Sequence, residues 1–394
     1  MEKIKVILKS GKDQSLKRYH PWVFSGAIKK IKGEPAEGDI VHVYDNKDEF
    51  LGIGHYQIGS IAIRIISFEN VDIDKAFWKK KLQRAVYLRQ TLDLLDNPET
   101  TVFRLINAEG DGFPGLVIDY YNGVLVIQAH SIGMYRTIDL LSEILQELFE
   151  NQLTAIYNKS DSTLPYKADI DRKNYYIFDK EKVSSVKENG LAFDINWEEG
   201  QKTGFYIDQR ENRLLLKRFS KDKTVLNLFG YTGGFSVYAL EGGCKSVDTV
   251  DSSKNAIDLA NKNIEKNFGS SANHRGIASD AFDYLNNRDT EYDVIVLDPP
   301  AFAKHHNVLH NALQGYKKLN RKAIQNINSG GVLFTFSCSQ VVSRENFRKM
   351  IFTAAAGTGR QVRILHQMDQ PSDHPINVYH PEGEYLKGLV LKID

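Results

Sequence analysis

The chain has 394 residues, 42% of them hydrophobic and 26% charged, and its formal net charge is only +1. This length suggests two or three domains of ordinary soluble composition, in which a nucleic-acid-binding surface would have to be local. No run of eighteen apolar residues occurs and the first residues lack the apolar core of a signal peptide, so we expect a cytoplasmic protein with no membrane partner.

Cysteine and histidine give little indication of a metal site. Two cysteines occur, Cys244 and Cys338, and their spacing matches neither a disulfide framework nor a zinc site. This use of cysteine is typical of a reducing cytoplasm. His306 and His310 are spaced like a helical metal pair, but no third ligand is evident, so we expect no metal ion. The oligomeric state does not follow from the sequence, and a homodimer is the assembly to test.

Residues 1–70 are predicted to form a β-rich domain, because the segments 39–44 and 60–66 combine strand-forming residues with flanking turn residues. The first half of this domain is basic and also carries aromatic side chains. The cations could bind phosphates while the rings stack on bases, although a merely solvated face explains the composition equally well. The candidate RNA contacts in this domain are Lys17, Arg18 and Trp22.

Residues 71–185 are predicted to form a linker helix and a small α+β domain. The segment 77–89 places its apolar residues on one helical face. The segment 103–119 has the pattern of a strand, a glycine-rich turn and a second strand. Because no helix follows these glycines, we interpret the turn as a hairpin connection and not as a phosphate-binding loop.

Residues 186–394 are predicted to form the third domain. The Asn-Gly pair at 189–190 lies between alternating segments and predicts a two-residue hairpin. The polar block 201–210 comes next, directly before the helix that leads to the first strand of an alternating region. This block could close over a cofactor or could be a plain domain junction. Its candidate cofactor contacts are Gln201, Thr203 and Phe205.

The stretch 225–235 predicts a cofactor pocket. Apolar residues at 225–229 indicate a short buried strand, Gly230 and Gly233 allow a sharp turn, and a helix begins at Phe235. A strand, a glycine turn and a helix N-terminus together form a nucleotide-type site. The spacing is not that of the dinucleotide fingerprint G-x-G-x-x-G.

Polar groups follow the next predicted strands, where open α/β sheets bind their ligands. Asp251 ends the strand 246–251, at the distance along the chain that suits a contact to a ribose diol. Asp280 and Asp298 end two further strands. We therefore predict a nucleotide-type cofactor site, and the family resemblance described below implies that its ligand is S-adenosylmethionine (SAM). Its candidate contacts are Phe229, Gly230, Gly233, Asp251, Asp280 and Asp298.

From residue 224 onward the predicted strands and helices alternate, which indicates an α/β, doubly wound sheet. The helices are expected near 235–242, 253–267, 308–328 and 343–356. A last strand at 386–393 completes a seven-stranded sheet in which this strand is antiparallel.

The motifs Asp298-Pro-Pro-Ala-Phe-Ala-Lys304 and Thr335-Phe-Ser-Cys-Ser-Gln340 resemble those of the bacterial ribosomal large-subunit RNA methyltransferase I family. Further motifs that contribute to the resemblance lie at 20–25, 109–116, 201–206, 229–235 and 380–387. The resemblance covers essentially the whole chain. It implies a SAM-dependent enzyme that makes 5-methylcytosine in 23S rRNA. It also implies a PUA domain, a small central α+β domain and a Rossmann-like class I methyltransferase domain.

The resemblance assigns chemistry to two residues. The Cys338 thiolate would add to C6 of cytosine and make C5 nucleophilic toward the SAM methyl group, although position alone is equally compatible with a buried structural cysteine. Asp298 would hydrogen-bond N3 of the base as the adduct forms. Lys304, in the same loop, is a candidate RNA contact. Cys244 is expected to lie at the start of a strand, away from the pocket.

One departure from the pattern leaves alternatives open. Some 5-methylcytosine enzymes carry a second cysteine in the Asp-Pro loop, but this loop has Pro299, Pro300 and Ala301. An Asp-Pro-Pro sequence followed by an aromatic residue, here Phe302, is also typical of N-methyltransferases, which could act on guanine in rRNA without a covalent intermediate. A non-catalytic RNA-binding protein of ribosome assembly is the third hypothesis.

Overall fold

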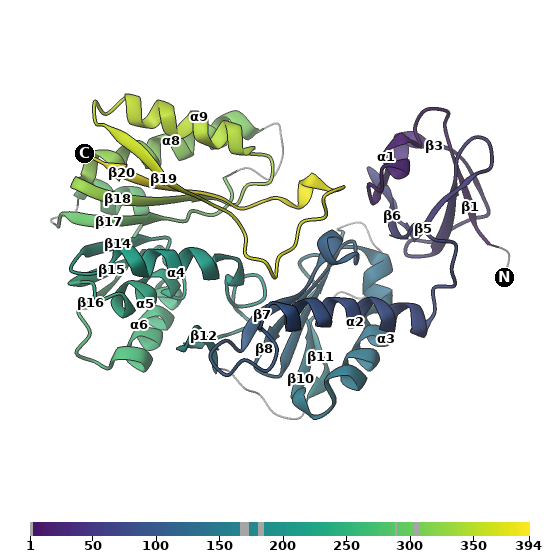
Figure 1. The fold of residues 1–394 in the computed structure, drawn as a ribbon, viewed down its shortest axis with the longest axis horizontal. Helices are drawn as coiled ribbons and strands as arrows, with labels where there is room; N and C mark the ends of the chain where they lie inside the picture. The colour runs from purple at the N-terminus through teal and green to yellow at the C-terminus, as the bar shows by residue number, and fades with distance from the viewer. Residues whose placement is uncertain (1–2, 166–172, 180–184, 288–289, 303–307) are drawn as a thin grey trace. The chain divides into compact units, whose positions relative to one another are not determined.

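The computed structural model describes residues 3–165, 173–179, 185–287, 290–302 and 308–394 (Figure 1). The chain divides into two compact units. Unit 1 contains Met1–Gly190, Ile195–Phe205 and Ser372–Gly383, and unit 2 contains Leu191–Asp194, Tyr206–Pro371 and Glu384–Asp394. Two segments that follow the expected boundary at residue 186 belong to unit 1, and the three expected domains stay a prediction. None of the described helices is long and apolar enough to cross a membrane.

The N-terminal part of unit 1 is a six-stranded sheet with the order β2-β6-β5-β4-β1-β3. The strands are β1 (Lys5–Leu8), β2 (Trp22–Phe24), β3 (Ile28–Lys32), β4 (Ile40–Tyr44), β5 (Phe50–Tyr56) and β6 (Ile61–Ser67), and the short helix α1 is Gln14–Lys17. Strand β1 is antiparallel to β3 and parallel to β4. Alternate residues such as Val6, Val43 and Ile63 are buried in its core, as expected for strands with one apolar face.

The rest of unit 1 is an α+β fold with a five-stranded sheet of order β11-β10-β9-β8-β7. Its elements are α2 (Lys75–Thr91), β7 (Val102–Asn107), β8 (Leu116–Tyr121), β9 (Val124–Ala129), α3 (Ile132–Phe149), β10 (Ala155–Asn158) and β11 (Tyr175–Asp179). The Asp74 side chain caps helix α2 by accepting a hydrogen bond from Phe77 N. The helix buries Trp78 and Leu82. The glycine-rich segment connects antiparallel strands β7 and β8, so the hairpin interpretation is confirmed.

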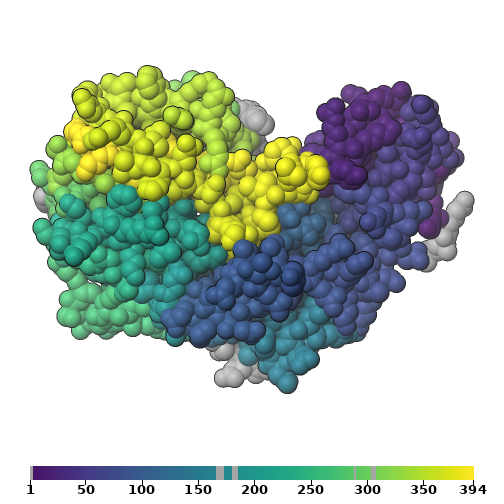
Figure 2. All heavy atoms as spheres, in the orientation of Figure 1, coloured from purple at the N-terminus to yellow at the C-terminus, as the bar shows by residue number. Residues whose placement is uncertain are grey.

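Unit 2 contains a seven-stranded sheet of order β16-β15-β14-β17-β18-β20-β19. The strands are β14 (Thr224–Leu228), β15 (Ser246–Asp251), β16 (His274–Ala278), β17 (Tyr292–Leu297), β18 (Ile327–Ser337), β19 (Val362–Met368) and β20 (Lys387–Ile393). The helices are α4 (Arg210–Phe219), α5 (Gly234–Glu241), α6 (Lys254–Phe268), α7 (Ala281–Asn287), α8 (Leu309–Asn326) and α9 (Arg344–Ala356). The predicted α/β sheet is confirmed, and its last strand, β20, is antiparallel to both neighbours. In the space-filling view, side chains fill the gaps that the ribbon leaves between helices and sheet (Figure 2).

The topology of this sheet determines where polar groups meet. Strands β14, β15, β17 and β18 are parallel, so their C-terminal ends share one edge. Leu228 pairs with Val250 on one side and with Leu297 on the other, and Leu297 pairs with Thr335. The residues that follow these positions therefore lie at adjacent strand ends.

Candidate functional site

The turn after β14 has an unusual backbone. Phe229, Tyr231 and Gly233 have positive φ angles of 59°, 44° and 78°. At Gly230 a Cβ atom would lie 2.3 Å from the Thr249 side chain, and at Gly233 it would lie 2.9 Å from Ala260 Cβ. The two glycines therefore let the turn pack closely on β15 and α6. Because α5 starts immediately afterwards, its free N–H groups face the turn, as a nucleotide-type site requires.

The Asp251 carboxylate holds this turn from the neighbouring strand. Its Oδ2 accepts a hydrogen bond from Tyr231 N at 3.0 Å, and its Oδ1 accepts one from Ser253 N at 2.9 Å. Two carboxylate oxygens offer about four acceptor positions, so the group can accept further bonds from the hydroxyl groups of a ribose. The strand, glycine turn, helix and carboxylate fit the SAM site expected from the sequence.

We predict that Asp251→Ala weakens SAM binding by roughly ten-fold or more, because a hydrogen bond to a charged group contributes about 1.5–3 kcal/mol. Isothermal titration calorimetry measures this directly. The exposed carboxylate of Asp258, on α6, supplies the matched control, and Asp258→Ala should bind SAM as the wild type does. Equal affinity of the Asp251 and Asp258 variants would contradict the ribose assignment.

The Asp280 side chain caps a helix. Its Oδ1 accepts hydrogen bonds from Phe282 N at 2.8 Å and Asp283 N at 3.1 Å, so it caps the start of α7. The side chain is exposed. A contact between Asp280 and the adenine of SAM stays a prediction.

Asp298 follows β17 directly and is half-buried. Burial and, to a smaller extent, the negative charge of Asp208 raise its pKa from 3.8 to about 7, although a hydrogen bond from Gln209 and the charge of Arg213 oppose the change. At neutral pH a large fraction of Asp298 is therefore protonated. A protonated carboxyl group can donate a hydrogen bond to a ring nitrogen, which an ionised one cannot.

Cys338 lies one residue beyond β18, half-buried, with its Sγ 3.9 Å from the carbonyl oxygen of Pro299. The buried Lys387 donates from Nζ to Ser339 O at 2.8 Å and interacts electrostatically with Cys338. Burial lowers the pKa of Lys387 to about 8, so this lysine still carries charge at neutral pH. A cation beside a thiolate stabilises the nucleophilic form of the cysteine.

The second cysteine is in a different setting. Cys244 lies two residues before β15, and burial raises the pKa of its thiol to about 11. Its backbone N–H donates to Ala239 O at 3.2 Å, at the end of α5. These features are those of a structural cysteine.

The structure divides the block 201–210 between the two units. Gln201 is exposed, and Phe205 and Thr203 are buried in unit 1, where Thr203 Oγ1 donates to Asp119 Oδ2 at 2.6 Å. Thr203 also lies 2.8 Å from Tyr121 Oη, so its hydroxyl is fully engaged in that unit. A contact between these three candidates and SAM stays a prediction.

Sequence reasoning missed the second half of this block, which lies in unit 2. Tyr206 is close enough to Asp298 and Cys338 for their negative charges to raise its pKa, although burial is the main cause. Asp208 accepts a hydrogen bond from Tyr385 Oη at 2.8 Å. The polar run before α4 was the only feature of the sequence that could have indicated Tyr206 and Asp208 as site residues, because no spacing rule links them to Asp298.

The candidate RNA contacts differ in their surroundings. Lys17 Nζ lies 2.7, 3.2 and 3.7 Å from carboxylate oxygens of Asp13, Asp45 and Glu49, and its hydrogen bonds to Asp13 and Asp45 raise its pKa. Trp22 Nε1 donates to Glu109 Oε1 at 2.8 Å. Arg18 is exposed at the end of α1. Lys304 lies outside the described residues, as does His306. Contacts of these candidates with RNA stay predictions.

The edge strand β3 is rich in lysine. Lys29, Lys30 and Lys32 are exposed and form no ion pair within the part of the chain that the structure describes. We predict that replacing all three by alanine weakens RNA binding. The slope of log K against log salt should become shallower by up to about 2, at about 0.7 per lost contact to single-stranded RNA. Lys349→Ala is the control, because this exposed lysine on α9 already pairs with Glu345 at 2.6 Å, and an equal change in slope for both proteins would contradict this assignment.

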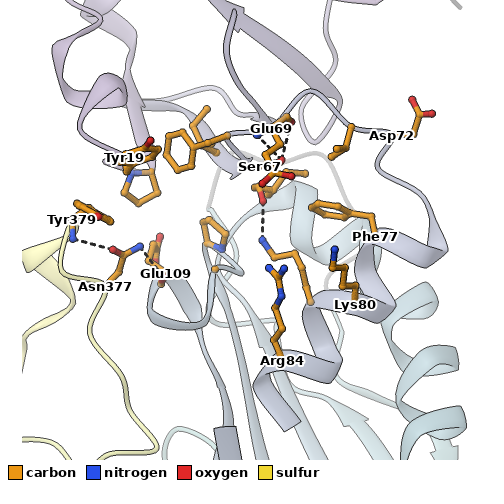
Figure 3. Close-up of a pocket in the computed structure, with 18 of the residues that line it drawn as sticks. Tyr19, Ser67, Glu69, Asp72, Phe77, Lys80, Arg84, Glu109, Asn377 and Tyr379 are labelled. Atoms are coloured by element: carbon orange, nitrogen blue, oxygen red, sulfur yellow. Dashed lines mark hydrogen bonds between the residues drawn. The ribbon is translucent and has the colours of Figure 1, made fainter. Parts of the chain in front are cut away.

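A cavity of about 650 Å³ opens between the N-terminal sheet, the start of α2 and the segment after Ser372, all in unit 1 (Figure 3). Its wall combines aromatic, basic and acidic side chains. Labelled members of these classes are Tyr19, Phe77, Tyr379, Lys80, Arg84, Glu69 and Asp72. This mixture could bind an unstacked nucleotide, which offers an aromatic face, amino groups and a phosphate.

One cluster has the composition of a metal site. Ligand atoms of His20, His380 and Glu382 lie within 4.8 Å of one another. However, His20 Nδ1 accepts a hydrogen bond from Trp22 N at 3.2 Å, which places the ring proton on Nε2 in the neutral histidine. That nitrogen lies 3.4 Å from Glu382 Oε2, where it can donate to the carboxylate, and the absence of a metal ion stays a prediction.

Comparisons with known proteins give two families. Residues 6–68 match the PUA-like domain family, and residues 104–379 match the S-adenosylmethionine-dependent methyltransferase family. The chain is 41% identical to ribosomal RNA large subunit methyltransferase I of Pseudoalteromonas translucida, over 98% of this chain and 99% of that protein. The protein of that name from Escherichia coli O157:H7 is 37% identical over 99% of each chain.

The fold of the whole chain also matches solved structures. One is a Streptococcus mutans protein described as a candidate SAM-dependent methyltransferase, with a TM-score of 0.84 and 25% identity, covering 98% of this chain and 99% of that one. Another is SMU.776, described as a candidate methyltransferase and solved with SAH, with a TM-score of 0.85, 25% identity and the same coverage.

Proposed function

Because this chain belongs to the ribosomal RNA large subunit methyltransferase I family, we propose that it methylates C5 of a cytosine in 23S rRNA. It is a SAM-dependent methyltransferase with a PUA-like domain. One observation carries the proposed chemistry: Cys338 and Asp298 follow paired parallel strands, with the Cys338 Sγ 3.9 Å from Pro299 O in the Asp-Pro loop. This arrangement would present a thiol and a carboxyl group to the same base.

The proposed reaction begins when the Cys338 thiolate adds to C6 of an unstacked cytosine. The new S–C6 bond breaks the C5–C6 double bond, and N3 takes the proton of the Asp298 carboxyl group as charge develops on the ring. When bound, SAM supplies the electrophilic methyl group that C5 attacks. A water molecule then accepts the C5 proton, the C5–C6 double bond forms again, the Cys338 thiolate is expelled, and N3 returns its proton to Asp298.

The proposed roles agree with the electrostatics of the two side chains. The raised pKa of Asp298, about 7, keeps a proton available at neutral pH. The charge of Lys387 supports the thiolate of Cys338. In the alternative N-methyltransferase, Phe302 would have to hold the base, but its ring packs on the buried Tyr316 with centroids 4.5 Å apart. We therefore favour the cysteine-dependent reaction.

The test is to methylate ribosomal RNA with the purified protein, digest it and identify the modified nucleoside by mass spectrometry. The proposal predicts 5-methylcytidine. An N-methylated guanosine would establish the nitrogen-methylating alternative, and an unmodified digest would favour the non-catalytic RNA-binding protein.

The remaining parts of the proposal concern the setting of the enzyme. We propose that it acts in the cytoplasm on its rRNA substrate and that no step requires a metal ion. Light scattering of the purified protein will determine whether it forms the homodimer considered above.

A further inference from the structure

Asp208 is an acidic residue in unit 2 that the reaction as described does not use. It lies in the short turn Ile207–Gln209 before α4. Its Oδ2 accepts a hydrogen bond from Tyr385 Oη at 2.8 Å, whereas its Oδ1 is buried and has no hydrogen-bond partner among the described residues. A buried carboxylate oxygen without a donor is costly, because it has lost its hydration and gained nothing in return. A ligand that brings a donor would remove this cost.

The neighbours of Asp208 show that this residue lies near Asp298. The charge of Asp208 acts on Asp298, and the adjacent residue Gln209 donates a hydrogen bond to the Asp298 carboxyl group. The Gln209 side-chain oxygen is occupied by a hydrogen bond from Asn212, at 2.7 Å, which leaves its amide N–H groups as the donors. Asp208 and Asp298 are thus two carboxyl groups in one site. Two nearby carboxyl groups resist being ionised together, and the charge of Asp208 accordingly contributes to the raised pKa of Asp298.

We infer that Asp208 accepts a hydrogen bond from the exocyclic amino group of the target cytosine while Asp298 contacts N3, so that the pair selects cytosine over uracil. This inference rests on the proposed function. Cytosine presents a donor at N4 beside an acceptor at N3, and uracil presents an acceptor at O4 beside a donor at N3. If Asp208 accepts and Asp298 donates, the pair matches N4 and N3 of cytosine. The same pair would place acceptor against acceptor at O4 of uracil and donor against donor at N3.

A tyrosine holds the Asp208 carboxylate in position. Tyr385 comes from the segment that leads into β20, and its hydroxyl donates to one oxygen of Asp208, while the other, buried oxygen has no donor among the described residues. Sites built to hydrogen-bond a polar group discriminate strongly against analogues that lack it, because the buried partner is then left unpaired. The main competing role for Asp208 is binding the ammonium group of SAM.

The test uses full-length protein and two RNA substrates, one with cytosine and one with pyrimidin-2-one at the target position. Pyrimidin-2-one lacks the exocyclic amino group but keeps N3, C5 and C6. Wild-type enzyme should methylate the analogue roughly 10- to 100-fold less efficiently in kcat/KM. Asp208→Ala should lose about the same factor on cytosine and little on the analogue, so that its preference between the two RNAs largely disappears. Its affinity for SAM should not change.

Two controls complete the test. Tyr385→Phe should reduce the preference for cytosine partially, because the carboxylate remains but is held less firmly, and Asp258→Ala on α6 should keep the full preference. An equal loss by Asp208→Ala on both RNAs, or a ten-fold weaker affinity for SAM, would overturn the inference. Absence of 5-methylcytidine in wild-type product would instead contradict the proposed function, so the two failures are distinguishable.

Discussion

Cys338→Ser should abolish methylation and leave SAM binding unchanged. Serine preserves the size of the side chain, but its hydroxyl does not ionise near neutral pH, so no nucleophile is available to attack C6. Since the thiolate makes C5 reactive, we expect kcat to fall on the order of 1,000-fold or more. Transfer of a labelled methyl group to RNA measures the rate, and calorimetry measures the affinity for SAM.

Cys244→Ser is the matched control for this experiment. Cys244 is half-buried at the start of β15, and its thiol pKa of about 11 makes it unreactive. The substitution removes the other cysteine of the chain and should retain nearly all activity. If both serine variants methylated RNA at the wild-type rate, the role of Cys338 would be disproved.

Asp298→Asn should have opposite effects on activity and on stability. Asparagine can donate a hydrogen bond to N3 but cannot give up a proton to it, so we expect a loss of about 100-fold or more in kcat, within the range for general acid catalysis. The same change removes a carboxyl group whose ionised form is unfavourable in the folded protein, because burial raises its pKa. The variant should therefore be more stable to thermal unfolding above neutral pH.

The pH dependence of this stabilisation follows from the raised pKa of Asp298. Between pH 3.8 and about 7 the unfolded chain releases the Asp298 proton while the folded protein keeps it, so the stability of the wild type falls as the pH rises through this window. The full cost, on the order of 4 kcal/mol, is present above pH 7. Asp298→Asn should thus exceed the wild type in Tm at pH 8 and match it at pH 4. Asp258→Asn, on the exposed face of α6, should show no such difference, and an equal Tm for the Asp298 variant at both pH values would contradict the account.

Much of the catalytic sheet could be predicted from the sequence, because parallel strands are buried on both faces and appear as apolar runs. In β17, for example, the residues from Val294 to Leu297 are all buried. The strand ends then follow from the same pattern, which is why Asp251, Asp298 and Cys338 could be assigned to one edge before the fold was known.

The surroundings of these residues could not be predicted, because they depend on segments far apart in the chain. Tyr385, which donates a hydrogen bond to Asp208, lies just before β20. Lys387, whose charge acts on Cys338, is the first residue of that strand. Thr203 is a further example. Nothing in the polar block indicated that its hydroxyl donates to Asp119, and its contact with SAM stays a prediction. Lys17 lies in a basic part of the sequence, and its three acidic partners could not be predicted because folding brings them together.

The covalent step is tested most directly with RNA that carries 5-fluorocytosine at the target position. Fluorine cannot leave C5 as a proton does, so the bond between Cys338 and C6 should persist after methyl transfer. The wild-type protein should therefore form an RNA adduct that survives denaturing electrophoresis, and Cys338→Ser should form none. A wild-type protein that forms no adduct, together with a serine variant that still methylates RNA, would contradict cytosine C5 methylation through Cys338.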